Sequence, residues 1–195
     1  CICAKINQYY YIIGDFSIMS ELRTNRIVPR DGLPSGSSGG IIQIKSTTKT
    51  DTMSQDSSSS FIDITGLSVS ITPTRSDSKI FIIANINFGF STTGTDLAVR
   101  LVRDSTAIGI GDADGSRERV SYGFETYGHN YGNKRMNSVP IHFLDSPSTT
   151  SSTTYKVQYK NESGATIHVN RTGNDTNASD FPRAISTITV MEVSG

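Results

Sequence analysis

Cysteine, charge and long apolar runs are all scarce in this chain of 195 residues. The only cysteines, Cys1 and Cys3, lie at the extreme N-terminus, too close together to close a useful disulfide loop. The rest of the chain must therefore fold without disulfides, which suits both a reducing cytosol and an oxidising exterior. No run of about 18 or more apolar residues occurs, so no membrane insertion is predicted.

Charge of either sign is also in short supply. Eighteen basic and eighteen acidic residues cancel, and no basic stripe is present, so nucleic acid is not an expected partner. Apolar residues make up 35% of the chain and charged residues 18%, while Ser, Thr, Gly and Asn fill the remainder. This composition favours short strands with polar solvated faces and many turns rather than disorder, which requires high net charge.

The N-terminal 40 residues differ from the rest of the chain in their residue pattern. Residues 1–18, with three consecutive tyrosines, are interpreted as upstream translation that precedes a start at Met19. A signal peptide is the alternative, although no small-residue cleavage site is present. Residues 19–40 form a polar, proline-punctuated arm that ends in the flexible hinge Ser35–Gly40 (SGSSGG). The folded body is expected to span residues 41–195.

The body shows the alternating apolar and polar pattern of β-strands separated by turn residues. The run 79–90 is the most apolar and predicts the central buried strand, and 185–193 predicts a second interior strand. Around Gly66 the alternation slips by one residue, which predicts a β-bulge. The predicted strands are 41–50, 61–73, 79–90, 96–103, 137–144, 154–160, 165–170 and 185–193.

No sustained helical period occurs, so the predicted fold class is all-β: an antiparallel β-sandwich that resembles a jelly roll. A sandwich leaves unpaired strand edges that natural proteins protect. Assembly of three copies around an axis would cover them, and we therefore expect a homotrimer.

One glycine-rich segment contains residue types found in phosphate and calcium sites, but it lacks the remaining features of either site. Gly109–Gly115 (GIGDADG) is rich in glycine, but no helix pattern follows to complete a phosphate cradle. Asp112 and Asp114 could contribute to a calcium site, but no glutamate closes a calcium-binding loop at the required spacing. A glycine-rich turn is the simpler interpretation, and neither a metal nor a cofactor is predicted.

The three histidines, His129, His142 and His168, are not spaced to chelate a metal locally. His142 and His168 alternate with apolar neighbours, which places them on the strand face opposite the core, toward solvent or a sister copy. No nucleophile elbow is present and no carboxylate pair is recognisable, so the prediction is a non-enzymatic protein. A hydrolase acting on a host envelope stays open as a remote alternative.

The segment Tyr122–Tyr131 (YGFETYGHNY) interleaves aromatic residues with Gly and Asn. Rings with a flat apolar face and a polar tip are the side chains that contact sugars and proteins. A strand and turn whose rings simply pack is the competing interpretation. The candidate receptor-contact residues are Tyr122, Phe124, Tyr127, His129 and Tyr131.

Several long phrases in the body resemble tail-fibre-like or structural virion proteins from phages of marine cyanobacteria and other marine bacteria. They cover most of residues 41–193 in order: IIQIKSTTKTDTMS (41–54), FIDITGLSVSITPTRSDSKI (61–80), AVRLVRDSTAIGIGDADGSRERV (98–120), FLDSPSTTSSTTYKVQY (143–159) and VNRTGNDTNASDFPRAISTITVMEV (169–193). The resemblance implies a trimeric β-sandwich head on a virion, assembled in the cytoplasm of a bacterial host.

The arm also looks like the N-terminal tag that joins such proteins to the particle. The candidate attachment residues are Leu22, Arg23, Asn25, Arg26, Ile27, Val28, Pro29 and Arg30. Because a long repetitive shaft is absent, the resemblance implies a short fibre, a tail-tip knob or a capsid decoration protein. Its expected partners are other virion proteins, through the arm, and a host surface glycan or protein. A lectin-like carbohydrate-binding module is the alternative function.

Overall fold

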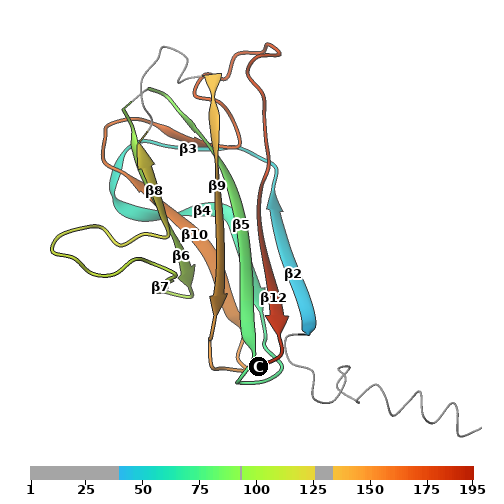
Figure 1. Ribbon diagram of the computed structural model, residues 1–195. Helices are drawn as coiled ribbons and strands as arrows, with labels where there is room; N and C mark the ends of the chain where they lie inside the picture. Colours follow the sequence, from blue (N-terminus) through green and yellow to red (C-terminus); the bar gives the residue numbers. More distant parts are fainter. Residues whose placement is uncertain (1–39, 93, 126–133) are drawn as a thin grey trace, which may run out of the picture.

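The computed structural model describes residues 40–92, 94–125 and 134–195, and all of its named elements are β-strands. The predictions for residues 1–18 and for the arm 19–40 fall, apart from Gly40, outside these described residues. Two antiparallel sheets face one another, which confirms the predicted β-sandwich (Figure 1). The six-stranded sheet contains β2 (Ile41–Lys49), β3 (Met53–Gln55), β5 (Lys79–Phe90), β9 (Met136–Asp145), β11 (Ile167–Val169) and β12 (Ser186–Val193).

The five-stranded sheet contains β4 (Ser58–Ile71), β6 (Asp96–Arg103), β7 (Thr106–Ile108), β8 (Tyr122–Glu125) and β10 (Thr153–Asn161). The main strand orders are β2-β12-β5-β9 in one sheet and β4-β10-β6-β8 in the other. Along the chain, successive long strands belong to alternate sheets. Strands β2, β5, β9 and β12 lie in the six-stranded sheet, and β4, β6 and β10, which come between them in the sequence, lie in the five-stranded sheet. The four main strands of each sheet, connected in this way, form the jelly roll that the sequence predicted.

Strand β5 is the centre of the core, as its apolar sequence predicted. It pairs with β12 on one side and β9 on the other, and β11 pairs with its last residues. Ile80, Ile82, Ile86 and Phe88 point inward and are fully buried. Burial of each such side chain contributes about 1.5–3 kcal/mol to stability. Across the sandwich, the rings of Phe88 and Tyr159 meet edge to face with centroids 5.4 Å apart.

The predicted bulge at Gly66 is present. Strand β10 advances by two residues, from Lys156 to Gln158, while its partner on β4 changes from Ser68 to Asp63. Gly66 adopts a φ of 80°, a left-handed conformation that a residue with a side chain adopts only with strain. The extra residues allow Ile64 and Leu67, on opposite sides of the slip, both to reach the core.

Two short strands were not predicted: β3 and β7 contain only three residues, too few to display an alternating pattern. Strand β8 corresponds to the strand and turn that was one of the two interpretations of 122–131. The predicted strand 165–170 is also shorter than expected. It ends at Val169 because Asn170 turns the chain with a φ of 65°. The buried Asn170 amide donates to the carbonyl oxygens of Lys49 and Asp51 and accepts a hydrogen bond from the Ser186 hydroxyl.

The folded body begins and ends at the same end of the sandwich. The Ser194 amide donates to the Gly40 carbonyl oxygen at 3.0 Å, beside the start of β5. Strand β5 then carries the chain roughly 36 Å to the opposite end. There β8 ends at Glu125, paired with Asp96, and β9 begins at Met136, paired with Gly89 (Figure 1).

One buried polar cluster links the two sheets. Arg103 donates two hydrogen bonds of 2.9 Å to the Asp145 carboxylate, which also accepts one of 2.7 Å from the Tyr155 hydroxyl. Burial, followed by the hydrogen bond to Asp145, raises the pKa of Tyr155 far above the usual range. Four residues further along the same strand, the buried Tyr159 hydroxyl has no hydrogen-bond partner among the described residues.

These two tyrosines predict opposite effects of one chemical change. Tyr155→Phe removes a hydrogen bond to a buried carboxylate and should lower the free energy of unfolding by about 1.5–3 kcal/mol. Tyr159→Phe removes a hydroxyl that is buried without a partner, so it should be neutral or stabilise by up to about 1 kcal/mol. Urea unfolding of the two variants measures both values, and equal destabilisation would contradict this account of the cluster.

Candidate functional site

The predicted receptor-contact segment begins on strand β8, where Tyr122 and Phe124 are separated by one residue. Phe124 packs against the core, and its ring meets Phe90 and Tyr122 edge to face, with centroids 5.8 and 5.9 Å apart. Tyr122 is 39% exposed. The packing interpretation therefore holds for Phe124, while Tyr122 presents a ring to solvent. Tyr127, His129 and Tyr131 lie outside the described residues.

Two open hollows adjoin β8. The smaller, about 360 Å³, lies between β8 and the start of β9 and is lined by Tyr122, Phe124, Met136, Asn137 and Ser138. The larger, about 460 Å³, is an acidic cleft whose lining includes four carboxylates and one ammonium group. These charged residues come from four separate segments: Asp96, Glu118, Glu125, Lys160 and Glu162.

The charges in the acidic cleft are partly neutralised. Lys160 forms ion pairs with Glu118 and, at 2.6 Å, with Glu162, and these contacts raise the pKa of the lysine. Asp96 and Glu125 face one another across the paired strands β6 and β8. The cleft therefore offers mainly hydrogen-bond acceptors beside an aromatic edge, which suits a ligand that carries hydroxyl or amino groups and disfavours an anionic one.

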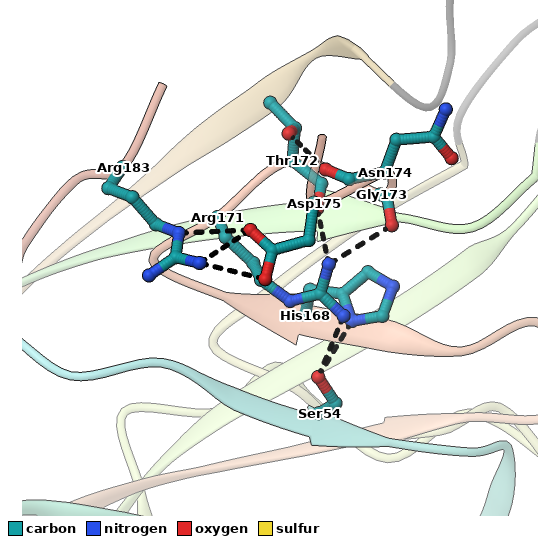
Figure 2. Close-up of polar contacts among 8 residues, drawn as sticks. All are labelled: Ser54, His168, Arg171, Thr172, Gly173, Asn174, Asp175 and Arg183. Atoms are coloured by element: carbon teal, nitrogen blue, oxygen red, sulfur yellow. Dashed lines mark hydrogen bonds and ion pairs between the residues drawn. The ribbon is translucent and has the colours of Figure 1, made fainter. Parts of the chain in front are cut away.

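A second polar cluster surrounds His168 on β11 (Figure 2). His168 Nδ1 lies 2.9 Å from the Ser54 hydroxyl on β3, and Arg171 also donates to that hydroxyl at 3.2 Å. The Arg171 guanidinium donates further to the backbone carbonyl oxygens of Thr172 and Gly173. Arg183 holds Asp175 through a bidentate ion pair.

The Ser54–His168 contact has the geometry of a nucleophile and a base, but not the electrostatics. Burial, followed by the positive charge of Arg171, lowers the pKa of His168 to about 4, too low for an effective general base at neutral pH. No carboxylate among the described residues hydrogen-bonds the ring to orient it: Asp175 binds Arg183, and Asp56 accepts from Thr166. The cluster is better suited to fastening the segment after β11 onto β3.

The prediction for the two described histidines was half right. His142 on β9 is exposed, as expected. His168 does face away from the core, between the buried Ile167 and Val169, but it is only 4% exposed and not open to solvent. The alternating pattern identifies the correct face, but it cannot show that the segment carrying Arg171 and Asp175 folds back over that face.

The glycine-rich segment forms a turn-containing loop, as the simpler interpretation predicted, and no helix follows it. Asp114 pairs with Arg117 at 2.7 Å, and Arg119 donates to the Gly111 carbonyl oxygen. Gly109 is required because a Cβ there would lie 2.7 Å from the ring of Phe143. No group of three or more potential metal ligands gathers within the described part of the chain.

The fold defines the class of this protein as an antiparallel jelly-roll sandwich. No family model and no curated protein matches the chain. Similar solved structures come from infectious bursal disease virus: the Gx strain (TM-score 0.40, 18% identity), the derived T=1 particles (0.43, 15%) and the VP2 subviral particle (0.42, 16%). Each comparison covers 85% of this chain but only 44%, 39% and 42% of those chains, so this chain spans less than half of their length.

The lowered pKa of His168 predicts a loss of stability in mild acid. In the unfolded chain the His168 ring, with a pKa of 6.5, binds a proton near that pH, whereas in the folded chain its pKa of about 4 delays protonation until about pH 4. The free energy of unfolding should therefore fall by about 3 kcal/mol between these values because of this residue alone.

His168→Asn removes the titrating group while keeping a polar atom near the position of Nδ1. Urea unfolding between pH 4 and pH 7 should show a flatter profile for this variant than for the wild type. The same exchange at the exposed His142 serves as the control. Parallel profiles for His168→Asn and the wild type would show that His168 is not held neutral in the folded chain.

Proposed function

We propose that this chain is a non-enzymatic virion structural protein of a bacteriophage: a short fibre, tail-tip knob or capsid decoration protein with a trimeric jelly-roll head. The observation that carries the proposal is that the N-terminus of the body and the end of β8 lie at opposite ends of the sandwich. The chain enters the body at Gly40, beside Ser194, and the candidate receptor segment leaves β8 at the opposite end. A head anchored through its N-terminus therefore carries the end of β8, from which that segment continues, at the end opposite its attachment point.

The arm supports the same proposal from the sequence. Residues 19–40 contain no core-forming run and end in the hinge Ser35–Gly40, which separates the candidate attachment residues Leu22–Arg30 from the head. The resemblance to phage virion proteins covers both the arm and the body. Within the described residues, no helix is long and apolar enough to cross a lipid bilayer.

Deletion of residues 19–40 tests the role of the arm. The truncated chain should keep the β-rich circular dichroism and cooperative unfolding of the head, because the core lies beyond residue 40 and the deletion removes the Gly40 carbonyl that accepts from Ser194 but no core residue. Its incorporation into particles, measured by quantitative immunoblotting of purified virions, should be lost. Wild-type incorporation of a folded truncation would contradict attachment through the arm.

A carbohydrate-binding head is the second candidate function, favoured by the hollows beside β8. The exposed Tyr122 ring offers a stacking surface, and the neighbouring acidic cleft offers acceptors for sugar hydroxyls. Its negative charge favours neutral or amino sugars over phosphorylated or sulfated ones. The two functions are compatible, because the head of a virion protein can itself bind a host glycan.

Tyr122→Ala tests this second function. Loss of one stacked ring costs about 0.5–1.5 kcal/mol, so affinity for a neutral host glycan should fall roughly twofold to tenfold. Tyr122→Phe keeps the ring and should bind like the wild type. Glycan arrays followed by calorimetry provide the measurement, and unchanged affinity in Tyr122→Ala would exclude this ring from the binding surface.

A further inference from the structure

The outward face of the six-stranded sheet carries a continuous apolar row. Leu144 on β9 pairs with Phe81 on β5, Phe81 with Met191 on β12, and Met191 with Ile44 on β2. None of the four belongs to the core cluster, and Leu144 and Ile44 are 53% and 54% exposed. The row therefore crosses the face from one edge strand to the other, on the side that no other described strand covers.

Neighbouring positions extend this row into a patch. On one side, Val193 pairs with Ile41, which is 53% exposed because a register shift in β2 lets both Ile41 and Ile44 face outward. On the other side, Ile83 pairs with His142 and Thr189. We call these residues together the apolar face: Ile41, Ile44, Phe81, Ile83, Leu144, Met191 and Val193.

The two outer faces of the sandwich differ sharply in charge. On β2, β5, β9 and β12, Lys79 is the one outward-facing residue with a permanent charge. The other charged residues of these strands occupy inward register positions: Lys45, Lys49, Asp145 and Glu192. The outer face of the five-stranded sheet carries Asp63, Arg100, Lys156 and Lys160, with Lys156 and Asp63 paired at 2.8 Å. The charged face is suited to solvent, whereas the apolar face is suited to a protein partner.

We propose that the apolar face is the surface through which copies of this chain associate with one another. Three observations favour a second copy as the occupant. A face with almost no charge meets its own copy without like-charge repulsion. It is a regular antiparallel sheet, which can pack against another sheet at about 10 Å. Ile41 also follows Gly40 directly, so the apolar face begins where the proposed arm joins the head.

The size of the face fits such an association. The apolar face forms the end of this outer surface nearest Gly40 and Ser194, and uncharged polar residues form the rest. The whole outer surface of the four strands, about 4.8 Å apart and about 27 Å long, covers roughly 500 Å² of each copy. Two faces together then bury about 1,000 Å², the lower bound for a specific interface. This inference deepens the proposed function, on which it rests for the expectation that copies assemble side by side. It names the surface of contact and needs no virion for its test.

The test is the oligomeric state of the full chain. The double variant Ile44→Glu and Leu144→Glu places two charges at exposed positions of the apolar face, where the fold of a single copy can accept them. The matched control, Thr65→Glu and Thr106→Glu, places the same charges at exposed positions of the five-stranded sheet. Sedimentation velocity gives the mass, and circular dichroism with thermal unfolding confirms that each variant is folded.

We expect the wild type and the control to sediment as dimers or trimers at micromolar concentration. The apolar-face variant should sediment at the mass of one chain, with association weakened at least about a hundredfold by the buried like charges. A monomeric wild type, or a folded double variant that still associates, would overturn the inference. Neither result bears on attachment through the arm, which the deletion of residues 19–40 tests separately.

Discussion

Burial of every second side chain of β5 between the two sheets is the constraint on which the rest of this structure depends. Its inward residues are fully buried, and strands on both sides of it complete its hydrogen bonds. Because the side chains of a strand alternate between two faces, fixing the inward set also fixes the outward set, including Phe81 and Ile83. A slip of one residue would exchange the core for the apolar face, so the core holds the outer surface in register.

The two outer faces of the sandwich differ in composition although they enclose the same core. Both sheets contribute alternate residues to the same core, yet one outer face carries paired charges such as Lys156 and Asp63, while the other carries Ile44 and Leu144. Core packing does not require this difference, because either set of side chains would leave the interior unchanged. The difference is the one expected if a single copy meets water on the charged side and, as proposed above, another copy on the apolar side.

Buried polar groups fix the connections that the apolar core cannot specify. Asn170 joins the chain after β11 to β2 and β12, and the contact between His168 and Ser54 fastens the neighbouring segment to β3. Arg103, Asp145 and Tyr155 link the two sheets in the same way. Each group is costly to bury without its partners, so these contacts select one arrangement of the loops among several that would bury similar apolar area.

The sequence by itself determined the features that depend on neighbours along the chain. The bounds of β5 and β6 agree with the predicted runs, and the slip at Gly66 is a bulge, because alternation and backbone freedom are local properties. Only the tertiary structure decided which strands adjoin. The row from Leu144 to Ile44 and the contact between Ser54 and His168 join residues about 100 positions apart. The acidic cleft likewise gathers carboxylates from four segments. Alternation assigns each side chain to a face, but long-range strand pairing decides what that face meets.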